Sequence, residues 1–165
     1  MDYSKEFCVS ISILFVSVAL SFLAFLYWYS LSFFVGSLFF VHWLSIIATV
    51  YIASFVPIYY VLKRVIGLKK NNTLLRFHVF GNLFSFLLIS IHFSQNAGRL
   101  AQFLSRLEEG SVLFLVLNII VVTGMIERFV YRNQLLRYTK PIHRYATAFF
   151  YLIVIIHAIQ NLFII

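Results

Sequence analysis

Apolar residues are concentrated in five long runs, which shorter polar stretches separate. A helix that spans a bilayer needs roughly 20 predominantly apolar residues. The runs of this length cover residues 7–29, 33–62, 74–93, 111–131 and 142–165. The pattern predicts an all-α membrane protein, a bundle of five transmembrane helices that forms a single membrane-embedded domain over residues 1–165.

The links between these runs differ in length and character. The link at 30–32 is too short for anything but a tight turn, whereas the link at 94–110 is longer, polar and mixed in charge. The second run carries Pro57 near its end, which predicts a kink or a last turn in the membrane interface.

Composition narrows the class further. Of 165 residues, 62% are apolar and 11% are charged, which lies outside ordinary soluble usage. The first residues lack the basic start of a secretory signal, and the run that follows is too long for a signal h-region, so we expect it to remain as a signal-anchor helix. The single cysteine, Cys8, excludes an internal disulfide and a cysteine-based zinc or iron–sulfur site.

The net charge of +8 is unevenly placed and predicts a topology. By the positive-inside rule, two basic clusters face the cytoplasm. The prediction is a cell-membrane protein with a cytoplasmic N-terminus, an outer C-terminus, and parallel helices over 74–93 and 142–165. Topology accounts for these charges; no motif points to nucleic acid, and membrane lipid is the expected surrounding. The clusters are Lys63, Arg64, Lys69, Lys70 and Arg76, and Arg128, Arg132, Arg137, Lys140 and Arg144.

Four histidines form two pairs with identical spacing. His78 and His92 are fourteen residues apart, and so are His143 and His157. Fourteen steps of ~100° fall about 40° short of four turns, so each pair lies on nearly one helix face. The rise is roughly 21 Å, most of a ~30 Å hydrocarbon core. On parallel helices, His78 and His143 share an inner level, and His92 and His157 share an outer level.

The two segments are alike beyond their histidines. Both continue from the second histidine to a Gln-Asn pair, and a small residue, Gly81 or Ala146, stands three positions after the first. A small residue one turn along lets a flat macrocycle approach, although such residues also mark helix–helix contacts.

Imidazole suits iron, and two imidazoles from facing helices can occupy both axial positions of a haem. The pattern therefore favours two b-type haems stacked between the third and fifth helices. Zinc is poorly supported, because each level offers two histidines without a carboxylate or thiolate. A proton relay would need polar residues between the levels, and a single membrane histidine can also serve only as a hydrogen-bond partner.

With these His-x13-His segments, residues 74–165 resemble the ferric reductase-like transmembrane family, which includes ferric reductases, NADPH oxidases and STEAP-type metalloreductases. The resemblance implies that His78 and His143 ligate an inner haem and that His92 and His157 ligate an outer one. It also implies electron flow from a cytoplasmic flavin to an outside acceptor. The chain shows five spans where six are usual, and it has no Gly-x-Gly-x-x-Gly run for a dinucleotide. A partner subunit or a membrane quinol would then supply electrons.

Several polar residues are candidates for supporting roles. Arg76 and Arg144 could contact the inner propionates or act only as positive-inside anchors. His42 could contact an outer propionate, a quinone or an acceptor metal, or be an interfacial histidine beside Trp43. The amides near the outer level could serve propionates or the acceptor, or cap their helices. These are Gln95, Asn96, Gln160 and Asn161.

The sequence thus predicts a dihaem cytochrome b for transmembrane electron transfer, a subunit of a ferric reductase-like or respiratory oxidoreductase complex with no catalytic residue of its own. One alternative is a quinol-oxidising cytochrome b membrane anchor, which requires a quinone pocket beside a haem. The other is a haem-free membrane scaffold or transporter subunit, which predicts no Soret absorption.

Overall fold

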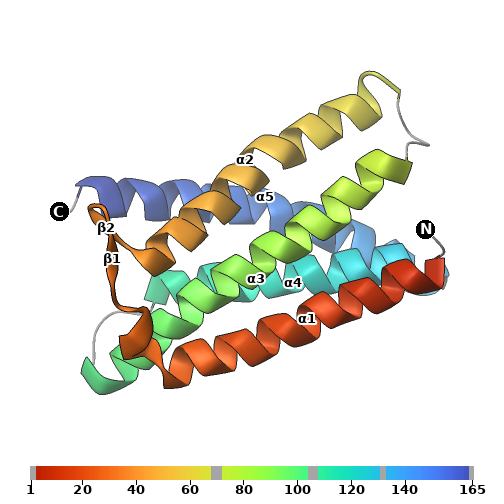
Figure 1. The fold of residues 1–165 in the computed structure, drawn as a ribbon. Coiled ribbons are helices and arrows are strands. Elements are labelled where there is room, and N and C mark those ends of the chain that lie inside the picture. Colours follow the sequence, from red (N-terminus) through yellow and green to blue (C-terminus); the bar gives the residue numbers. More distant parts are fainter. Residues whose placement is uncertain (1–2, 68–71, 104–107, 131–132, 164–165) are drawn as a thin grey trace. The chain divides into compact units, whose positions relative to one another are not determined.

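The computed structural model describes residues 3–67, 72–103, 108–130 and 133–163. In this part of the chain five α-helices carry the fold, together with a 3-10 helix and a two-stranded sheet (Figure 1). The predicted all-α class is confirmed. The elements are α1 (Tyr3–Leu26), the 3-10 helix η1 (Trp28–Leu31), β1 (Phe34–Val35), β2 (Leu38–Phe39), α2 (Phe40–Arg64), α3 (Asn72–Phe103), α4 (Glu108–Phe129) and α5 (Asn133–Phe163).

Two compact units divide the chain, an N-terminal unit over Met1–Phe103 and a C-terminal unit over Leu104–Ile165. In the N-terminal unit, α3 packs between α1 and α2 (Figure 1). In the C-terminal unit, α4 and α5 pack side by side and run antiparallel. The sequence predicts that both units belong to a single membrane domain, and this stays a prediction.

The face that α1 buries is small and polar. Its buried residues, Ser10, Ser17 and Ala24, are spaced seven apart, and Glu6 lies one turn before them. Small residues on one stripe let two helix backbones approach closely, which is how helices associate in lipid. At Gly98 of α3, an added Cβ would lie only 2.4 Å from the carbonyl oxygen of Phe25. This glycine is therefore required by the close contact between α1 and α3.

We expect Gly98→Ala to destabilise the N-terminal unit by about 1–3 kcal/mol, the usual range for overpacking. The obstacle is a backbone oxygen inside a helix, which cannot rotate away as a side chain would. Unfolding of the purified protein by SDS titration in mixed micelles measures this. Gly110→Ala is the matched control, because nothing lies within 4 Å of an added Cβ there. Equal stability of the two variants would contradict this packing.

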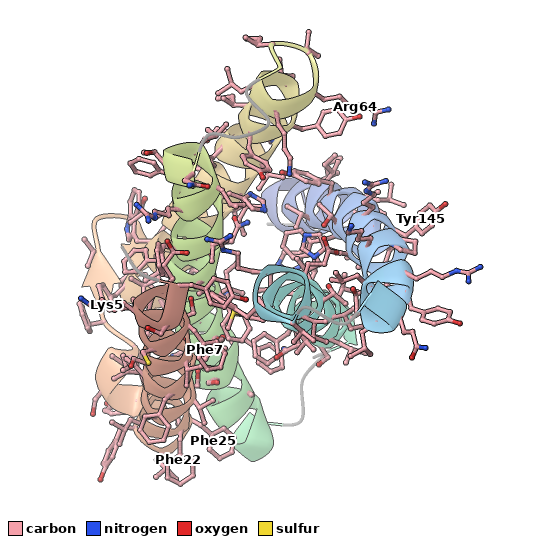
Figure 2. All side chains as sticks on the ribbon, turned by 90° about the vertical axis from the view of Figure 1, so that its right-hand side faces the viewer. Lys5, Phe7, Phe22, Phe25, Arg64 and Tyr145 are labelled. Carbon is pink, nitrogen blue, oxygen red and sulfur yellow. The ribbon has the colours of Figure 1, made fainter. Side chains whose placement is uncertain are left out.

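The outer surfaces of the helices are apolar, the reverse of a soluble protein. On α1 the exposed face carries Phe15, Val18 and Phe22, which are 75%, 68% and 62% exposed. Figure 2 shows Phe22 projecting from α1, and Tyr145 projecting from α5 in the same way. Buried polar and exposed apolar side chains together are what a lipid solvent favours.

Four of the described helices are long and apolar enough to cross a membrane, which confirms the transmembrane character for four predicted spans. The fifth predicted span, 142–165, ends outside the described residues and stays a prediction, as do the membrane type and the orientation. The four stretches are Tyr3–Leu26, Phe40–Arg64, Asn72–Arg99 and Gly110–Phe129.

The second predicted span, 33–62, begins too early. Helix α2 begins at Phe40, and β1 and β2 form a short hairpin before it, with Phe34 opposite Phe39. The two-residue turn has Gly36 at a φ of 65°, which glycine adopts without strain. Trp43 Nε1 donates a hydrogen bond of 2.8 Å to the Val35 carbonyl and ties the hairpin to α2. The link after α1 is therefore longer than the tight turn expected at 30–32.

The prediction of a polar loop at 94–110 is also wrong, because most of this stretch is helical. Helix α3 continues to Phe103, and α4 begins at Glu108. Likewise, α5 begins at Asn133, before the apolar run. The reason is physical: hydropathy marks where the bilayer would end, whereas a helix continues through polar residues that tolerate helical geometry.

Candidate functional site

The four paired histidines lie on two long helices, one in each unit. His78 and His92 belong to the uninterrupted helix α3. His143 and His157 belong to α5, which also runs without a break despite Pro141. All four side chains are half-buried. Both rings on α3 contact side chains of α2, so the face predicted from the fourteen-residue spacing is a face turned to α2.

The imidazole of His92 is fixed by the backbone of α2. Its Nδ1 lies 3.0 Å from the carbonyl oxygen of Val41. Because a carbonyl only accepts hydrogen bonds, Nδ1 must carry the proton, and Nε2 then holds the lone pair. The amide of Asn96 lies 3.3 Å from Nε2 as a donor, in agreement with this tautomer. In the neutral ring of His92, Nε2 is therefore the nitrogen that carries the lone pair.

His143 has the same arrangement in the C-terminal unit. Its Nδ1 lies 3.1 Å from the carbonyl oxygen of Ile120 and 3.0 Å from the hydroxyl oxygen of Thr123, both on α4. The Thr123 hydroxyl donates its own proton to the Ile119 carbonyl at 2.6 Å, so its oxygen can accept from His143. Gly124 leaves room for the ring, since an added Cβ would lie 3.2 Å from Cε1. In the neutral ring the lone pair is then again on Nε2.

His78 is held differently, by an aromatic ring. Tyr59 of α2 stacks on it with ring centroids 4.2 Å apart and planes inclined by 11°. The amide nitrogen of Asn82 lies 3.3 Å from Nδ1 and 3.5 Å from Nε2. The Asn82 carbonyl oxygen is buried without a hydrogen-bond partner in the described part of the chain. A half-turn of this amide would pair that oxygen with an Nδ1 proton and give His78 the tautomer of the other two rings.

One signal at the site was found only in part from the sequence, which singled out Asn96 and Asn161 but not Asn82 and Thr147. Each of these four residues stands four positions after one of the paired histidines. Residues four apart lie on one helix face. Asn82 and Asn96 contact the imidazole that precedes them. Asn96 also donates to the carbonyl oxygen of His92 at 3.0 Å, as Thr147 does to that of His143 at 2.7 Å. The side chain of Asn161 lies outside the described residues.

The arginines expected near the propionates differ from each other. The Arg76 Nε donates to Glu6 Oε1 of α1 at 2.6 Å, and Glu6 is 4% exposed. Part of the Arg76 charge is thus balanced within the N-terminal unit, a contact that the sequence analysis did not foresee. Arg144 is exposed on α5.

The amides expected at the outer level also have separate surroundings. Asn96 contacts His92, as described above. Gln95 is buried and donates to the carbonyl oxygen of Trp28 at 3.2 Å and to the Ser32 hydroxyl at 2.8 Å. It therefore ties α3 to the segment after α1. The side chains of Gln160 and Asn161 are outside the described residues.

His42 stands beside His92 at the start of α2. The two ring centroids are 5.3 Å apart and the planes are inclined by 58°. Its Nδ1 is buried and has no hydrogen-bond partner among the residues that the structure describes. The guanidinium of Arg99 lies 5.8 Å from the ring of Phe39, which itself contacts His42. His42 is thus part of the surroundings of His92 and not an isolated surface histidine.

The position of Gly81 has an explanation other than a macrocycle. An added Cβ would overlap the phenol of Tyr51, whose hydroxyl donates to the carbonyl oxygen of Phe77 at 2.6 Å. The glycine therefore admits a tyrosine of α2 against α3. The partner position, Ala146, is half-buried on α5.

Metal-binding groups of three or more His, Cys, Asp or Glu side chains do not occur in the described residues. The histidines described above therefore offer their nitrogens singly or in pairs.

Comparisons with known proteins give no assignment: no protein-family model, no curated protein and no solved structure matches this chain. The chemistry of the histidines must therefore be argued from the chain itself.

Proposed function

We propose that the chain is a dihaem cytochrome b that carries electrons across a membrane, as a subunit of a ferric reductase-like or respiratory oxidoreductase complex. His78 and His143 would ligate one haem b, and His92 and His157 a second. The proposal requires α3 and α5 to run parallel with their histidines at matching depths. Electron-donating and electron-accepting subunits, or a quinone, are the expected partners, in a surrounding of membrane lipid.

The observation that carries the proposal is the hydrogen bonding of two imidazole rings. His92 and His143 come from different helices, and each donates its Nδ1 proton to a backbone carbonyl of the neighbouring helix. Histidines that ligate a metal almost always donate their other ring proton in this way, because the bond fixes the tautomer and orients the ring. A neutral ring that donates through Nδ1 carries its lone pair on Nε2, the nitrogen that iron would take.

The residues present fit haem as the bound group. A low-spin haem takes two axial nitrogens and no third protein ligand, and the sequence offers two histidines for each of two haems. Bound haem would supply one-electron chemistry within an apolar layer. The chain's part is to present neutral imidazoles, and Asn96 would have to release Nε2 of His92 when iron takes that nitrogen. Arg76, already paired with Glu6, would reach a propionate only by sharing its guanidinium.

Electron transfer through vesicles tests the function. The haem-loaded protein is placed in liposomes that enclose ferricyanide, and dithionite is added outside. We expect loss of ferricyanide absorbance at a rate that rises with the amount of protein, because the haems would connect the two aqueous phases.

The matched control is His78→Ala/His92→Ala in the same lipids at the same density, which removes one ligand from each haem. Equal rates for this variant, the wild-type protein and empty liposomes would contradict transmembrane electron transfer.

A further inference from the structure

Tyr59 lies on the face of α2 that packs against α3, next to one proposed iron ligand. Its ring is nearly parallel to the imidazole of His78, with an inclination of 11° and a centroid distance of 4.2 Å. Two flat rings in this contact restrict each other, because rotating either one brings its edge into the face of the other. The imidazole plane of His78 is thus set by the plane of Tyr59.

The two histidines of α3 are oriented by different means. His92 lies at 58° to its aromatic neighbour His42, and its ring is anchored by the Val41 carbonyl. His78 has the parallel stack, together with the Asn82 amide, which lies within 3.5 Å of both ring nitrogens. An amide placed between both nitrogens defines the ring plane less sharply than one linear bond. We therefore assign the orientation of His78 chiefly to the stack.

Tyr59 is itself held in place. Its hydroxyl accepts a hydrogen bond of 3.0 Å from Lys63 Nζ, which lies 5.2 Å from the centre of the ring. One residue further, Tyr60 accepts a hydrogen bond of 2.6 Å from Arg64, whose guanidinium lies 5.5 Å from that ring. The two tyrosines thus make the same kind of contact with a cation one turn along. Tyr60 is 54% exposed, whereas Tyr59 is half-buried on His78.

We propose that Tyr59 is a positioning residue for His78: its ring fixes the plane of the imidazole and thereby tunes the haem that His78 binds. The inference rests on the proposed function. The plane of an axial imidazole governs its overlap with the iron d orbitals, so the g values and the midpoint potential of a bis-histidine haem respond to it. A side chain that packs on a ligand in this way can orient it without touching the metal.

The test uses the full-length haem-loaded protein in detergent, with electron paramagnetic resonance of the oxidised form and a redox titration. Tyr59→Leu should shift the low-field g value and the midpoint of one haem, the one whose signal is lost in His78→Ala. Tyr59→Phe should keep the g value and the midpoint potential of the wild-type protein, because it retains the flat ring and removes only the hydroxyl. Tyr60→Leu, the matched control, should leave both haems unchanged. If Tyr59→Leu does not fold, Tyr59→Met fills a similar volume without a ring.

Each outcome decides the matter. Unchanged spectra and potentials in a ring-less variant that still holds wild-type amounts of haem would overturn the role of Tyr59 alone. An equal shift in Tyr60→Leu would overturn it too, since the effect would then come from the end of α2 in general. A wild-type protein without haem would instead overturn the proposed function, and the role of Tyr59 with it.

Discussion

Replacing His78 and His143 together by alanine should leave about one haem per chain, whereas replacing His78 and His92 together should leave none. The first variant removes both ligands of the same iron and spares the other iron. The second removes one ligand from each, and a b-type haem has no covalent bond to hold it. Haem per chain, measured as the pyridine haemochrome in protein of matched fold, distinguishes the two variants.

The crossed design controls for general damage, because each variant carries two substitutions of the same type. The mirror variant, His92→Ala/His157→Ala, should also retain about one haem per chain, because it removes both axial ligands of the other iron. Equal loss in all three variants would contradict the assignment of ligands by level. It would also remove the reason for placing α3 and α5 parallel.

Glu6→Ala should destabilise the protein by about 2 kcal/mol, because the Arg76 guanidinium would lose the Glu6 carboxylate. Breaking a fully buried pair costs roughly 3–5 kcal/mol, and this pair should cost less since the Arg76 side chain is 34% exposed. The free energy of unfolding, from SDS titration in mixed micelles, measures the effect. The free energy of unfolding should also fall in Glu6→Gln, because glutamine keeps the shape of the side chain but not its charge.

The matching control is the double variant Glu6→Ala/Arg76→Met, which removes both charges. It should be more stable than Glu6→Ala alone, because a charge that has lost its counter-charge costs more than the missing contact. If the loss of stability in the double variant equalled the sum of the losses in Glu6→Ala and Arg76→Met, the two side chains would not interact. The ion pair between α1 and α3 would then have no energetic role.

The sequence predicted the helices well, because long apolar runs have few other solutions in a membrane protein. It missed the hairpin at 34–39 because hydropathy does not separate a strand from a helix. The signal was nevertheless present: Gly36-Ser37 stands at the centre of a symmetrical apolar stretch, a recognised hairpin pattern. It also missed how far α3 and α5 extend, since those turns are polar.

The surroundings of the histidines were partly accessible from the sequence. Asn96 was a candidate from the sequence, and Asn82 follows from the same helical periodicity and could have been found. The carbonyl oxygens of Val41 and Ile120 could not, because every residue has one and only packing selects which of them meets a ring. The same holds for the ion pair of Arg76 with Glu6, seventy residues apart in the chain.

Haem held by these histidines would be visible in a reduced-minus-oxidised spectrum of the purified protein. We expect low-spin b-type bands and about two haems per chain by pyridine haemochrome, as four axial histidines require. A folded, helical preparation with no Soret band after expression with ample haem would contradict it and favour a haem-free membrane scaffold.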